Sequence, residues 1–226
     1  MSKYRQEIKM AINIFDKEVL IRRLNMVLPK DSHTGPKGYY TVRSLYFDDI
    51  HDTALLEKLT GVKYREKYRL RVYDESTAMI RLEKKVKNSG SGFKESAILS
   101  VAECQALIDR KYDFLKNRRE PVCKQLYTKM RSGLYRPKTI VEYKRQAFLW
   151  EPGRIRITVD SDVRTGLSSI DFLNFNTPLT GVLNNGTAIL EIKYDCYLPS
   201  HIAELIQLNS RHKAAISKYV LCRKYG

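Results

Sequence analysis

Short segments in which apolar and polar residues alternate recur along the chain and predict β-strands. Branched and aromatic residues are frequent in these segments, as they are in strands generally. The clearest of them cover residues 4–12, 40–47, 64–73, 78–86, 139–150, 154–160 and 188–194.

Segments with helical spacing lie between these strands. Asp16 is expected to cap the first, and Ser100 with Glu103 forms a capping box at the start of the second. Pro121 suits the first turn of the third helix, and Gly133 suits its end. Helices are therefore predicted at 17–28, 101–115, 121–133 and after Ser200, whereas 213–224 fits either a helix or a strand.

The order of the elements predicts an α+β fold in which strands predominate. Most connections between consecutive strands are too short for a parallel crossover, so the sheet is expected to be antiparallel. Only the stretch Asn-Ser-Gly-Ser-Gly at 88–92 reads as flexible, and it is short enough for a loop between two strands. No domain boundary is visible, so residues 1–226 are expected to form one domain.

The polar side of several predicted strands is strongly charged. Alternate residues of a strand share a face, so Lys67, Arg69 and Arg71 lie on one side and apolar or aromatic residues on the other. Lys84 is an exception, because it falls on an otherwise apolar side. The pattern recurs in Arg5/Glu7/Lys9, Arg81/Glu83/Lys85, Arg156/Thr158/Asp160 and Glu191/Lys193/Asp195.

An ordinary sheet with its polar face in water would explain one such strand. Five such strands, four of which mix Arg or Lys with a carboxylate or hydroxyl, favour a functional face instead. If an antiparallel barrel closes with these faces inward, they line a water-filled tunnel. Such a wall repels itself when empty and therefore predicts a polyanionic ligand, while its carboxylates suit Mg²⁺ or Mn²⁺.

Composition agrees with a polyanion-binding protein. Lys and Arg number 41 against 25 Asp and Glu, which gives a formal net charge of +16. A field of that sign attracts nucleic acids, anionic lipids and phosphate-rich molecules. Nucleic acid is disfavoured as the partner, because the basic residues fall on strand faces and not on an exposed patch or basic helix.

The cysteine spacing and the lack of long apolar runs predict a reducing, aqueous compartment. The four cysteines, Cys104, Cys123, Cys196 and Cys222, show no zinc-type spacing and are expected to be free thiols. No apolar run approaches the ~20 residues of a membrane-spanning helix, and residues 1–7 do not read as a secretory signal. A cytoplasmic location without direct membrane insertion is the expectation.

Nine charged motifs follow one another along the chain. They are Arg5-x-Glu7-x-Lys9, Ser44-Leu-Tyr-Phe-Asp48, Tyr68-Arg69-Leu-Arg71, Leu82-Glu83-Lys84-Lys85, Phe93-Lys94-Glu95, Glu142-Tyr143-Lys144-Arg145-x-Ala147-Phe148, Arg156-Ile-Thr-Val-Asp160, Leu190-Glu191-Ile-Lys193 and Ser217-Lys218-Tyr219. Each motif is weak by itself, and their order makes the set specific. The ordered set resembles the polyphosphate-polymerase (VTC-type) branch of the triphosphate tunnel metalloenzymes, a CYTH-like superfamily, in its compact bacterial form. The resemblance covers about residues 3–222.

The resemblance implies an antiparallel eight-stranded β tunnel with flanking helices, and ATP and polyphosphate as its ligands. It implies Glu191 as a metal ligand for Mn²⁺ or Mg²⁺, and Glu7 is a second candidate. Asp160 is kept as a weak candidate, whereas Asp48 and Asp49 are better explained as part of a turn or helix cap. The residues implied or expected to bind or act on phosphates are Lys9, Arg69, Arg71, Lys85, Arg145 and Arg156, with Arg5, Lys58, Lys94, Tyr143, Lys193, Ser217 and Lys218.

Two departures from the family pattern affect the expected activity. Hydrolytic members open with Glu-x-Glu-x-Lys, and Arg5 replaces the first acid here, which favours polymerase over triphosphatase activity. The polymerases carry a further Lys near Ser217, where this chain has Ala215 with Lys213 nearby.

A non-catalytic polyphosphate- or nucleotide-binding module therefore remains an alternative, and an inorganic triphosphatase is a weaker one. Because the eukaryotic relatives couple synthesis to a membrane channel, a separate membrane partner is a further expectation.

Overall fold

The structure is a computed structural model that describes residues 6–88, 91–208 and 212–224. The chain folds into two compact units. Unit 1 comprises residues 1–41, 143–163 and 183–217, and unit 2 comprises residues 42–142, 164–182 and 218–226. The prediction of a single family domain over residues 1–226 stays a prediction.

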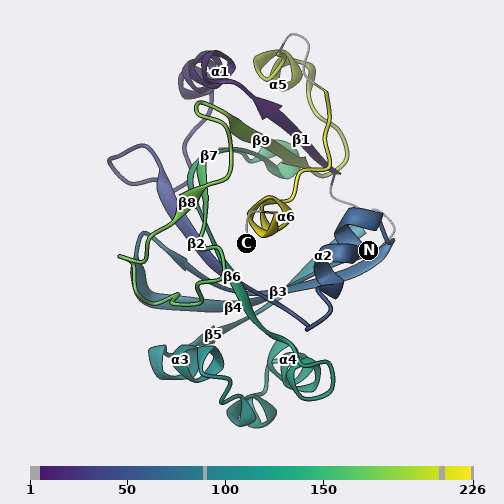
Figure 1. The fold of residues 1–226 in the computed structure, drawn as a ribbon. Coiled ribbons are helices and arrows are strands. Elements are labelled where there is room, and N and C mark those ends of the chain that lie inside the picture. The colour runs from purple at the N-terminus through teal and green to yellow at the C-terminus, as the bar shows by residue number, and fades with distance from the viewer. Residues whose placement is uncertain (1–5, 89–90, 209–211, 225–226) are drawn as a thin grey trace. The chain divides into compact units, whose positions relative to one another are not determined.

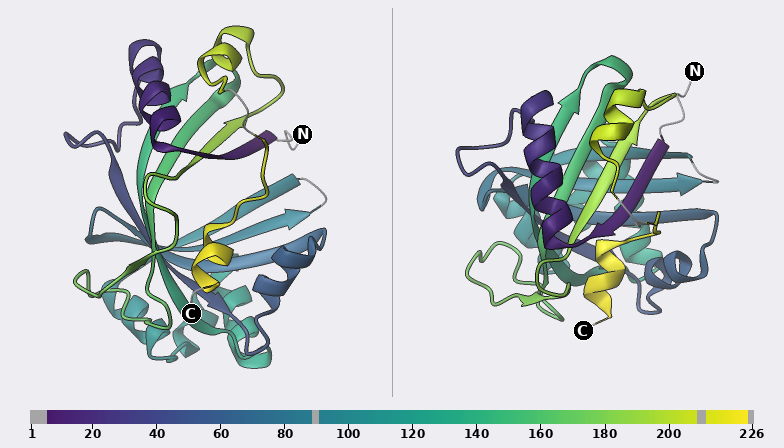
Figure 2. Two further views of the ribbon diagram at one scale, coloured as in Figure 1. Left: turned by 45° about the horizontal axis from the view of Figure 1, so that its top comes forward. Right: turned by 90° about the horizontal axis from the view of Figure 1, so that it is seen from above.

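Unit 1 is an antiparallel sheet with helices on its apolar face. Side chains from the strands and from both helices form one buried cluster that includes Ile12, Leu20, Leu24, Ile157 and Ile202. Figures 1 and 2 show α1 and α5 over the same side of β1 and β9. The strand order is β1 (Gln6–Ile12), β9 (Ala188–Tyr194), β7 (Ile155–Thr165) and β6 (Arg136–Trp150), with α1 (Ile14–Val27), η2 (Pro152–Arg154) and α5 (Ser200–Leu205).

Unit 2 is likewise an antiparallel sheet with helices packed on its apolar face. Leu70, Leu82, Leu107 and Leu126 belong to its buried cluster, in which α3 and α4 pack on the sheet. β6 and β7 contribute residues to both units, and β8 pairs with the end of β7. The strands run in the order β6, β2 (Tyr40–Asp48), β3 (Tyr64–Tyr73), β4 (Ser76–Asn88) and β5 (Ser91–Leu99), with β8 at Thr180–Gly181. The helices are α2 (Thr53–Thr60), α3 (Val101–Ile108), η1 (Asp113–Asn117), α4 (Pro121–Ser132) and α6 (Lys218–Arg223).

The predicted α+β class, with an antiparallel sheet and flanking helices, is confirmed. Eight strands form the hydrogen-bonded path and β8 is an addition to it. All seven predicted strands are present. β3 and β9 have the predicted bounds, the ends of β2, β4, β6 and β7 are shifted, and residues 4 and 5 of the first predicted strand lie outside the described residues. The segment 213–224 contains a helix at Lys218–Arg223. Within the predicted 88–92 loop, β4 continues to Asn88 and β5 begins at Ser91, while residues 89 and 90 lie outside the described residues. The enclosure of the charged faces in one tunnel stays a prediction.

Two helix boundaries were predicted wrongly. Asn13 caps α1 instead of Asp16, because the Asn13 side chain accepts the backbone N–H of Asp16 at 2.8 Å. Asp16 lies inside the first turn, where a carboxylate favours the positive end of the helix. α3 ends at Ile108 and not near Leu115, because Arg110 adopts a left-handed backbone with φ of 62°.

Helix α2 and strand β5 were not predicted as elements. α2 has only eight residues, which is too short for a clear helical period. In the described part of the chain, no helix combines the length and apolar character needed to cross a membrane.

Replacing Asn13 by Ala should lower the free energy of unfolding by about 1 kcal/mol, because one backbone N–H of α1 loses its cap. Asn13→Asp keeps a capping oxygen and serves as the matched control, with little expected change. Urea denaturation of the three proteins measures the difference. Equal stabilities of Asn13→Ala and the parent chain would show that the cap contributes nothing.

Candidate phosphate-binding faces

One face of the unit 2 sheet carries a set of charged and hydroxyl side chains. They belong to residues that alternate with the apolar positions packed against α3 and α4. The antiparallel register places Arg69 opposite both Tyr46 and Glu83, and Arg71 opposite Ser44. The sheet therefore holds these polar side chains in adjacent rows on the side away from the helices.

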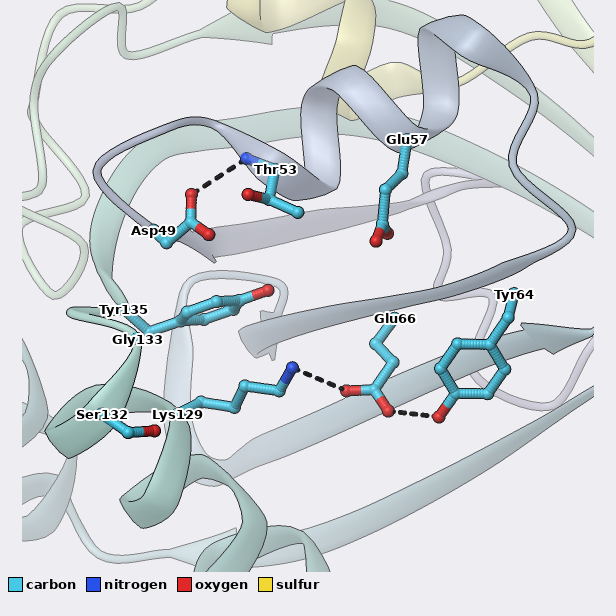
Figure 3. A pocket seen from close by; sticks show the side chains of 9 residues that line it. All are labelled: Asp49, Thr53, Glu57, Tyr64, Glu66, Lys129, Ser132, Gly133 and Tyr135. Carbon is cyan, nitrogen blue, oxygen red and sulfur yellow. Dashed lines mark hydrogen bonds and ion pairs between the residues drawn. The ribbon is translucent and has the colours of Figure 1, made fainter.

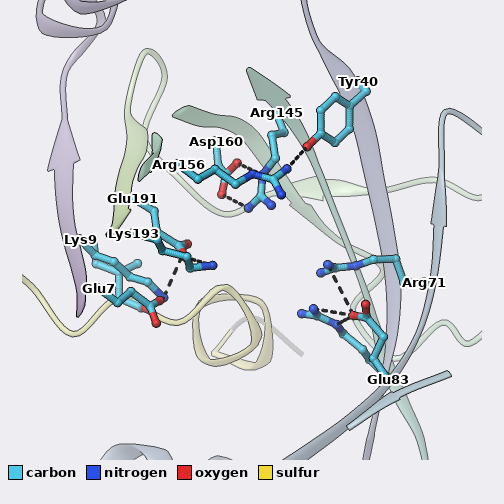
Figure 4. A network of polar contacts seen from close by, with 12 residues as sticks. Glu7, Lys9, Tyr40, Arg71, Glu83, Arg145, Arg156, Asp160, Glu191 and Lys193 are labelled. Atoms are coloured by element: carbon cyan, nitrogen blue, oxygen red, sulfur yellow. Dashed lines mark hydrogen bonds and ion pairs between the residues drawn. The ribbon is translucent and has the colours of Figure 1, made fainter. Parts of the chain in front are cut away.

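Glu83 is the centre of an ion-pair cluster on this face. Its side chain is 1% exposed, and it lies 2.7 Å from Arg69, 3.5 Å from Arg71 and 3.0 Å from Lys94. Figure 4 shows Arg71 directed at this carboxylate. One negative charge is thus surrounded by three positive charges, which leaves an excess of positive charge for an anion.

Neighbouring hydroxyls fix the two arginines. Arg69 donates to the Tyr46 hydroxyl at 2.9 Å, and Arg71 donates to the Ser44 hydroxyl at 3.1 Å. Guanidinium groups held in this way are suited to bidentate binding of phosphate oxygens.

The pKa of the Glu83 carboxyl shows how strong the local positive field is. Burial by itself would raise this pKa, because it disfavours the charged form. The nearby charges of Arg69, Arg71 and Lys94 outweigh burial and hold the pKa well below the ordinary value of 4.5. Glu83 is therefore ionised at neutral pH.

Like charges also lie directly opposite one another on this face. Lys85 of β4 pairs in register with Lys67 of β3 and with Lys94 of β5, and Arg71 pairs with Arg81. Like charges at directly opposed positions of an antiparallel pair destabilise the sheet. A bound polyanion would relieve this repulsion.

Helix α6 packs against the rest of unit 2 through its aromatic and basic side chains. The Tyr219 hydroxyl donates to Asp48 at 2.6 Å, and its ring stacks on Tyr46 with centroids 4.9 Å apart. Asp48 also accepts the backbone N–H groups of Ala54 and Leu55 at the start of α2, which confirms the predicted capping role of this acid. These contacts fix the helices that carry Lys218 and Lys58.

The corresponding face of unit 1 mixes positive and negative charges. The register aligns Lys9, Glu191 and Thr158 across β1, β9 and β7. Lys9 lies 2.8 Å from Glu7 and 3.8 Å from Glu191, and Lys193 lies 2.5 Å from Glu191. Figure 4 shows both lysines and both glutamates as one group.

Two arginines of unit 1 are held by buried acids. Arg145 makes a bidentate ion pair with Asp160, whose side chain is 0% exposed, through contacts of 2.6 and 2.7 Å. Arg156 donates to Asp31 at 2.7 Å and to the Tyr40 hydroxyl at 2.9 Å. Figure 4 shows Arg145, Arg156, Asp160 and Tyr40.

The Arg145 guanidinium also lies over the ring of Tyr143, 5.2 Å from its centroid. Two polar atoms of this face, the Nε of Arg156 and the hydroxyl of Thr158, are buried and have no hydrogen-bond partner among the described residues.

The acids of unit 1 fit a metal that arrives with its own phosphate ligands. Glu7 and Glu191 both flank the Lys9 amine, so their carboxylates lie near one another. In the described part of the chain, no group of three or more His, Cys, Asp or Glu could hold a metal ion. Mg²⁺ is commonly bound by one or two carboxylates with phosphates and water completing its shell, and this donor set matches that pattern.

The structure brings the predicted residues together in two groups. Arg69, Arg71, Lys85 and Lys94 share the unit 2 face, while Lys58 and Lys218 lie on helices of that unit. Arg5 lies outside the described residues. Unit 1 contains Glu7, Lys9, Tyr143, Arg145, Arg156, Glu191, Lys193 and Ser217.

Four residues of these faces, Ser44, Tyr46, Asp31 and Glu83, are not among the site residues that the sequence predicts. Ser44, Tyr46 and Asp48 are each two residues apart along β2 and therefore share one face, so the period of two could have identified Ser44 and Tyr46. Asp31 precedes β2 in a connecting segment, and no local pattern marks it as a partner of Arg156.

Replacing Glu83 by Gln should lower the free energy of unfolding at neutral pH by about 3 kcal/mol, because the largely buried guanidinium groups of Arg69 and Arg71 lose their counter-charge. The pKa of Glu83 is depressed in the folded state, so its contribution is present above about pH 4.5 and is lost as pH falls towards the folded value. The difference between variant and parent should therefore shrink in acid, as urea denaturation at several pH values would measure. A difference that is constant with pH would contradict the ion-pair explanation.

The chain is similar to several solved structures and matches one protein family. Solved structures that are similar include a proposed adenylate cyclase from Bacillus halodurans, with 15% identity, a TM-score of 0.44, and coverage of 89% of this chain and 87% of that one. The PH1819 protein from Pyrococcus horikoshii has 12% identity, a TM-score of 0.40, and coverage of 89% and 84%. A search of the curated proteins finds no match for this sequence. Residues 4–225 match the VTC domain, and the chain therefore belongs to the VTC domain family.

Proposed function

We propose that this protein is a polyphosphate polymerase that transfers the γ-phosphate of ATP to a growing polyphosphate chain. Membership of the VTC domain family supports a polyphosphate- or triphosphate-related function. The observation that carries the proposal is the row of Lys67, Lys85 and Lys94 directly opposite one another on three strands. Because these opposed lysines repel one another, a bound polyanion would stabilise this face of the sheet.

In unit 2, Arg69 and Arg71 are proposed to bind phosphate oxygens through their guanidinium groups. Tyr46, Ser44 and Glu83 already orient these groups, so little side-chain freedom is lost when the phosphate binds. Lys85 adds positive charge beside them. Phosphoryl transfer depends mainly on such positioning and on charge neutralisation.

In unit 1, Lys9, Lys193, Arg145 and Arg156 are proposed to bind further phosphates. Glu7 and Glu191 would hold Mn²⁺ or Mg²⁺, which would screen phosphate oxygens from one another. The lysines between these acids would be drawn towards phosphate when a cation takes their place at the carboxylates.

The proposed reaction needs no nucleophile from the protein. An oxygen of the terminal phosphate of the acceptor attacks the γ-phosphorus of ATP and forms a new P–O–P bond. The bond between that phosphorus and the β–γ bridging oxygen breaks, and ADP leaves with the electron pair. The polymer gains one phosphate unit for each ATP consumed.

Two other functions fit parts of the same evidence. Ala215 replaces a lysine that the polymerases carry, which favours a module that binds polyphosphate or nucleotide without turnover. The backbone of this segment is held beside β1, where the Ala214 N–H donates to the Lys9 carbonyl at 2.8 Å. An inorganic triphosphatase is disfavoured by Arg5 at the position of the first acid of the hydrolytic motif.

Products formed from ATP and Mn²⁺ distinguish these functions. The polymerase should yield long polymer and ADP, and charge reversal by Arg69→Glu should abolish synthesis while the protein stays folded. Loss of one such cation typically costs about 2.7–4 kcal/mol of transition-state stabilisation, a factor of about 10² to 10³ in rate. Gel analysis of polymer and quantification of ADP measure the effect.

Arg131→Glu is the matched control, because Arg131 is exposed on α4, where its guanidinium donates to the Tyr127 hydroxyl of the same helix. It should retain the parent rate. Release of orthophosphate alone, or tight binding without turnover, would replace the polymerase with the hydrolase or the binding module. Unchanged synthesis by Arg69→Glu would refute the role given to unit 2.

Glu191→Gln should raise the Mn²⁺ concentration needed for half-maximal activity, because the metal loses a charged oxygen ligand. Titration of activity with Mn²⁺ at saturating ATP measures this shift. Asp162→Asn removes a carboxylate that pairs with Lys144 elsewhere in unit 1 and should leave the metal requirement unchanged. Equal metal dependence of Glu191→Gln and the parent would remove Glu191 from the metal site.

A further inference from the structure

A small pocket lies in unit 2 on the side of β3 opposite the phosphate-binding face. It has a volume of about 200 Å³ and opens between α2, β3 and the end of α4. Glu66 and Tyr64 reach it because they alternate along β3 with Arg65 and Lys67. The pocket is therefore separate from the phosphate-binding residues.

The charge of the pocket is opposite to that of the protein as a whole. Its nine lining residues include Asp49, Glu57 and Glu66 but only one cation, Lys129. The chain carries a formal net charge of +16, whereas acids outnumber cations in this pocket. The pocket is thus chemically unsuited to the phosphates that the opposite face attracts.

Part of this negative charge is already engaged by the protein. Glu66 accepts the Tyr64 hydroxyl at 2.5 Å and lies 3.0 Å from Lys84 and 3.7 Å from Lys129. One oxygen of Asp49 accepts the backbone N–H of Thr53 at 2.9 Å. Glu66 is therefore satisfied, and Asp49 partly so.

Two polar groups of the pocket have no such hydrogen-bond or ion-pair partner among the described residues. Tyr135 is 7% exposed, its hydroxyl points into the pocket, and it has no hydrogen-bond partner in the part of the chain that is described. The Glu57 carboxylate faces the same space, and none of the described contacts is a hydrogen bond or ion pair to it. The Tyr135 side chain is thus mostly buried while its hydroxyl remains open to a partner, and a ligand in the pocket could supply that hydrogen bond.

Burial raises the pKa of the Glu57 carboxyl, because desolvation penalises its charged form more than Lys129 stabilises it. A cation in the pocket would reverse this effect.

We propose that this pocket binds a small organic cation, an ammonium or guanidinium group on a short aliphatic chain. The Tyr135 hydroxyl would accept one of its N–H groups, while Glu57 and the second oxygen of Asp49 would supply negative charge. Aromatic rings also attract such cations. The pocket is smaller than sites for drug-sized ligands, so it suits a head group and not a large molecule.

A metal ion is a poorer match for this pocket. In the described residues, no three acids, cysteines or histidines converge closely enough to hold one. An organic cation needs no such convergence, because its several N–H groups point to separated acceptors.

Lys129 is an internal competitor for the proposed ligand. Its ammonium lies 3.7 Å from Glu66 and 5.6 Å above the ring of Tyr135, so it occupies part of the same negative site. Its side chain is 44% exposed and can move towards solvent when a ligand enters. Lys129→Met should therefore tighten binding, which a purely structural role of this residue would not produce.

Calorimetric titration at low ionic strength tests the proposal with two probes, 1,4-diaminobutane and N-acetyl-lysine methylamide. Binding of the first alone would assign a free amine, and binding of the second would assign a basic side chain of a partner protein. Glu57→Gln and Tyr135→Phe should each weaken binding by about three- to tenfold, as loss of one hydrogen bond or charge contact predicts. No ATP or polyphosphate is present, so the result is independent of the proposed polymerase activity.

Glu204→Gln and Tyr197→Phe are matched controls in unit 1, since both side chains are exposed there. They should bind the probes as the parent does, and thermal melting verifies that every variant is folded. The proposal is overturned if neither probe binds, or if the pocket variants bind as tightly as the controls. Binding of Mg²⁺ alone with the same dependence on Glu57 would also overturn it in favour of a metal site.

Discussion

Each strand that carries candidate functional residues has one apolar face and one charged face. In each unit, helices cover one face of the sheet with apolar contacts, so the charged side chains can only occupy the other face. The side-chain period of a strand is two residues, and a shift of one residue would move Arg69 and Arg71 beneath α3 and α4. Core packing therefore fixes the residues that are proposed to bind phosphate as firmly as any contact among them does.

The two faces differ in charge balance, and this difference has chemical consequences. In unit 2, one buried carboxylate, Glu83, is surrounded by a larger number of cations. Such a face gains most when phosphate enters, because the anion relieves repulsion between residues held in register. In unit 1, each cation has a nearby acid, namely Glu7, Glu191, Asp160 or Asp31.

A balanced face binds a bare polyanion less strongly than a positive one does. It suits a phosphate group that carries a divalent cation, since the acids then gain a partner as the lysines and arginines turn to phosphate. The metal requirement of the proposed reaction is therefore assigned to unit 1 and not to the cluster around Glu83.

The alternation of apolar and charged residues predicted seven of the strands and which of their faces is charged, but it did not predict β5. It could not predict which acid partners each cation, because Arg156 is held by Asp31, which is distant in sequence and outside any strand pattern. Local signals also failed where two residues compete for one role, as Asn13 and Asp16 do at the start of α1. Short elements such as α2 carry too few residues for a period to emerge.

The exceptions to the alternation are as informative as the rule. Lys84 and Glu66 lie on the helix-covered side of β4 and β3, where they form a 3.0 Å ion pair with side chains only 8% and 13% exposed. A buried ion pair is often no more stable than apolar residues of similar volume, so packing alone gives no reason for these two residues. Their physical consequence is to bring a carboxylate, with its tyrosine and lysine partners, to the wall of the small pocket. The same strand that presents arginines on one side thus presents an acidic pocket wall on the other, and β3 carries residues of both the proposed phosphate site and the proposed cation site.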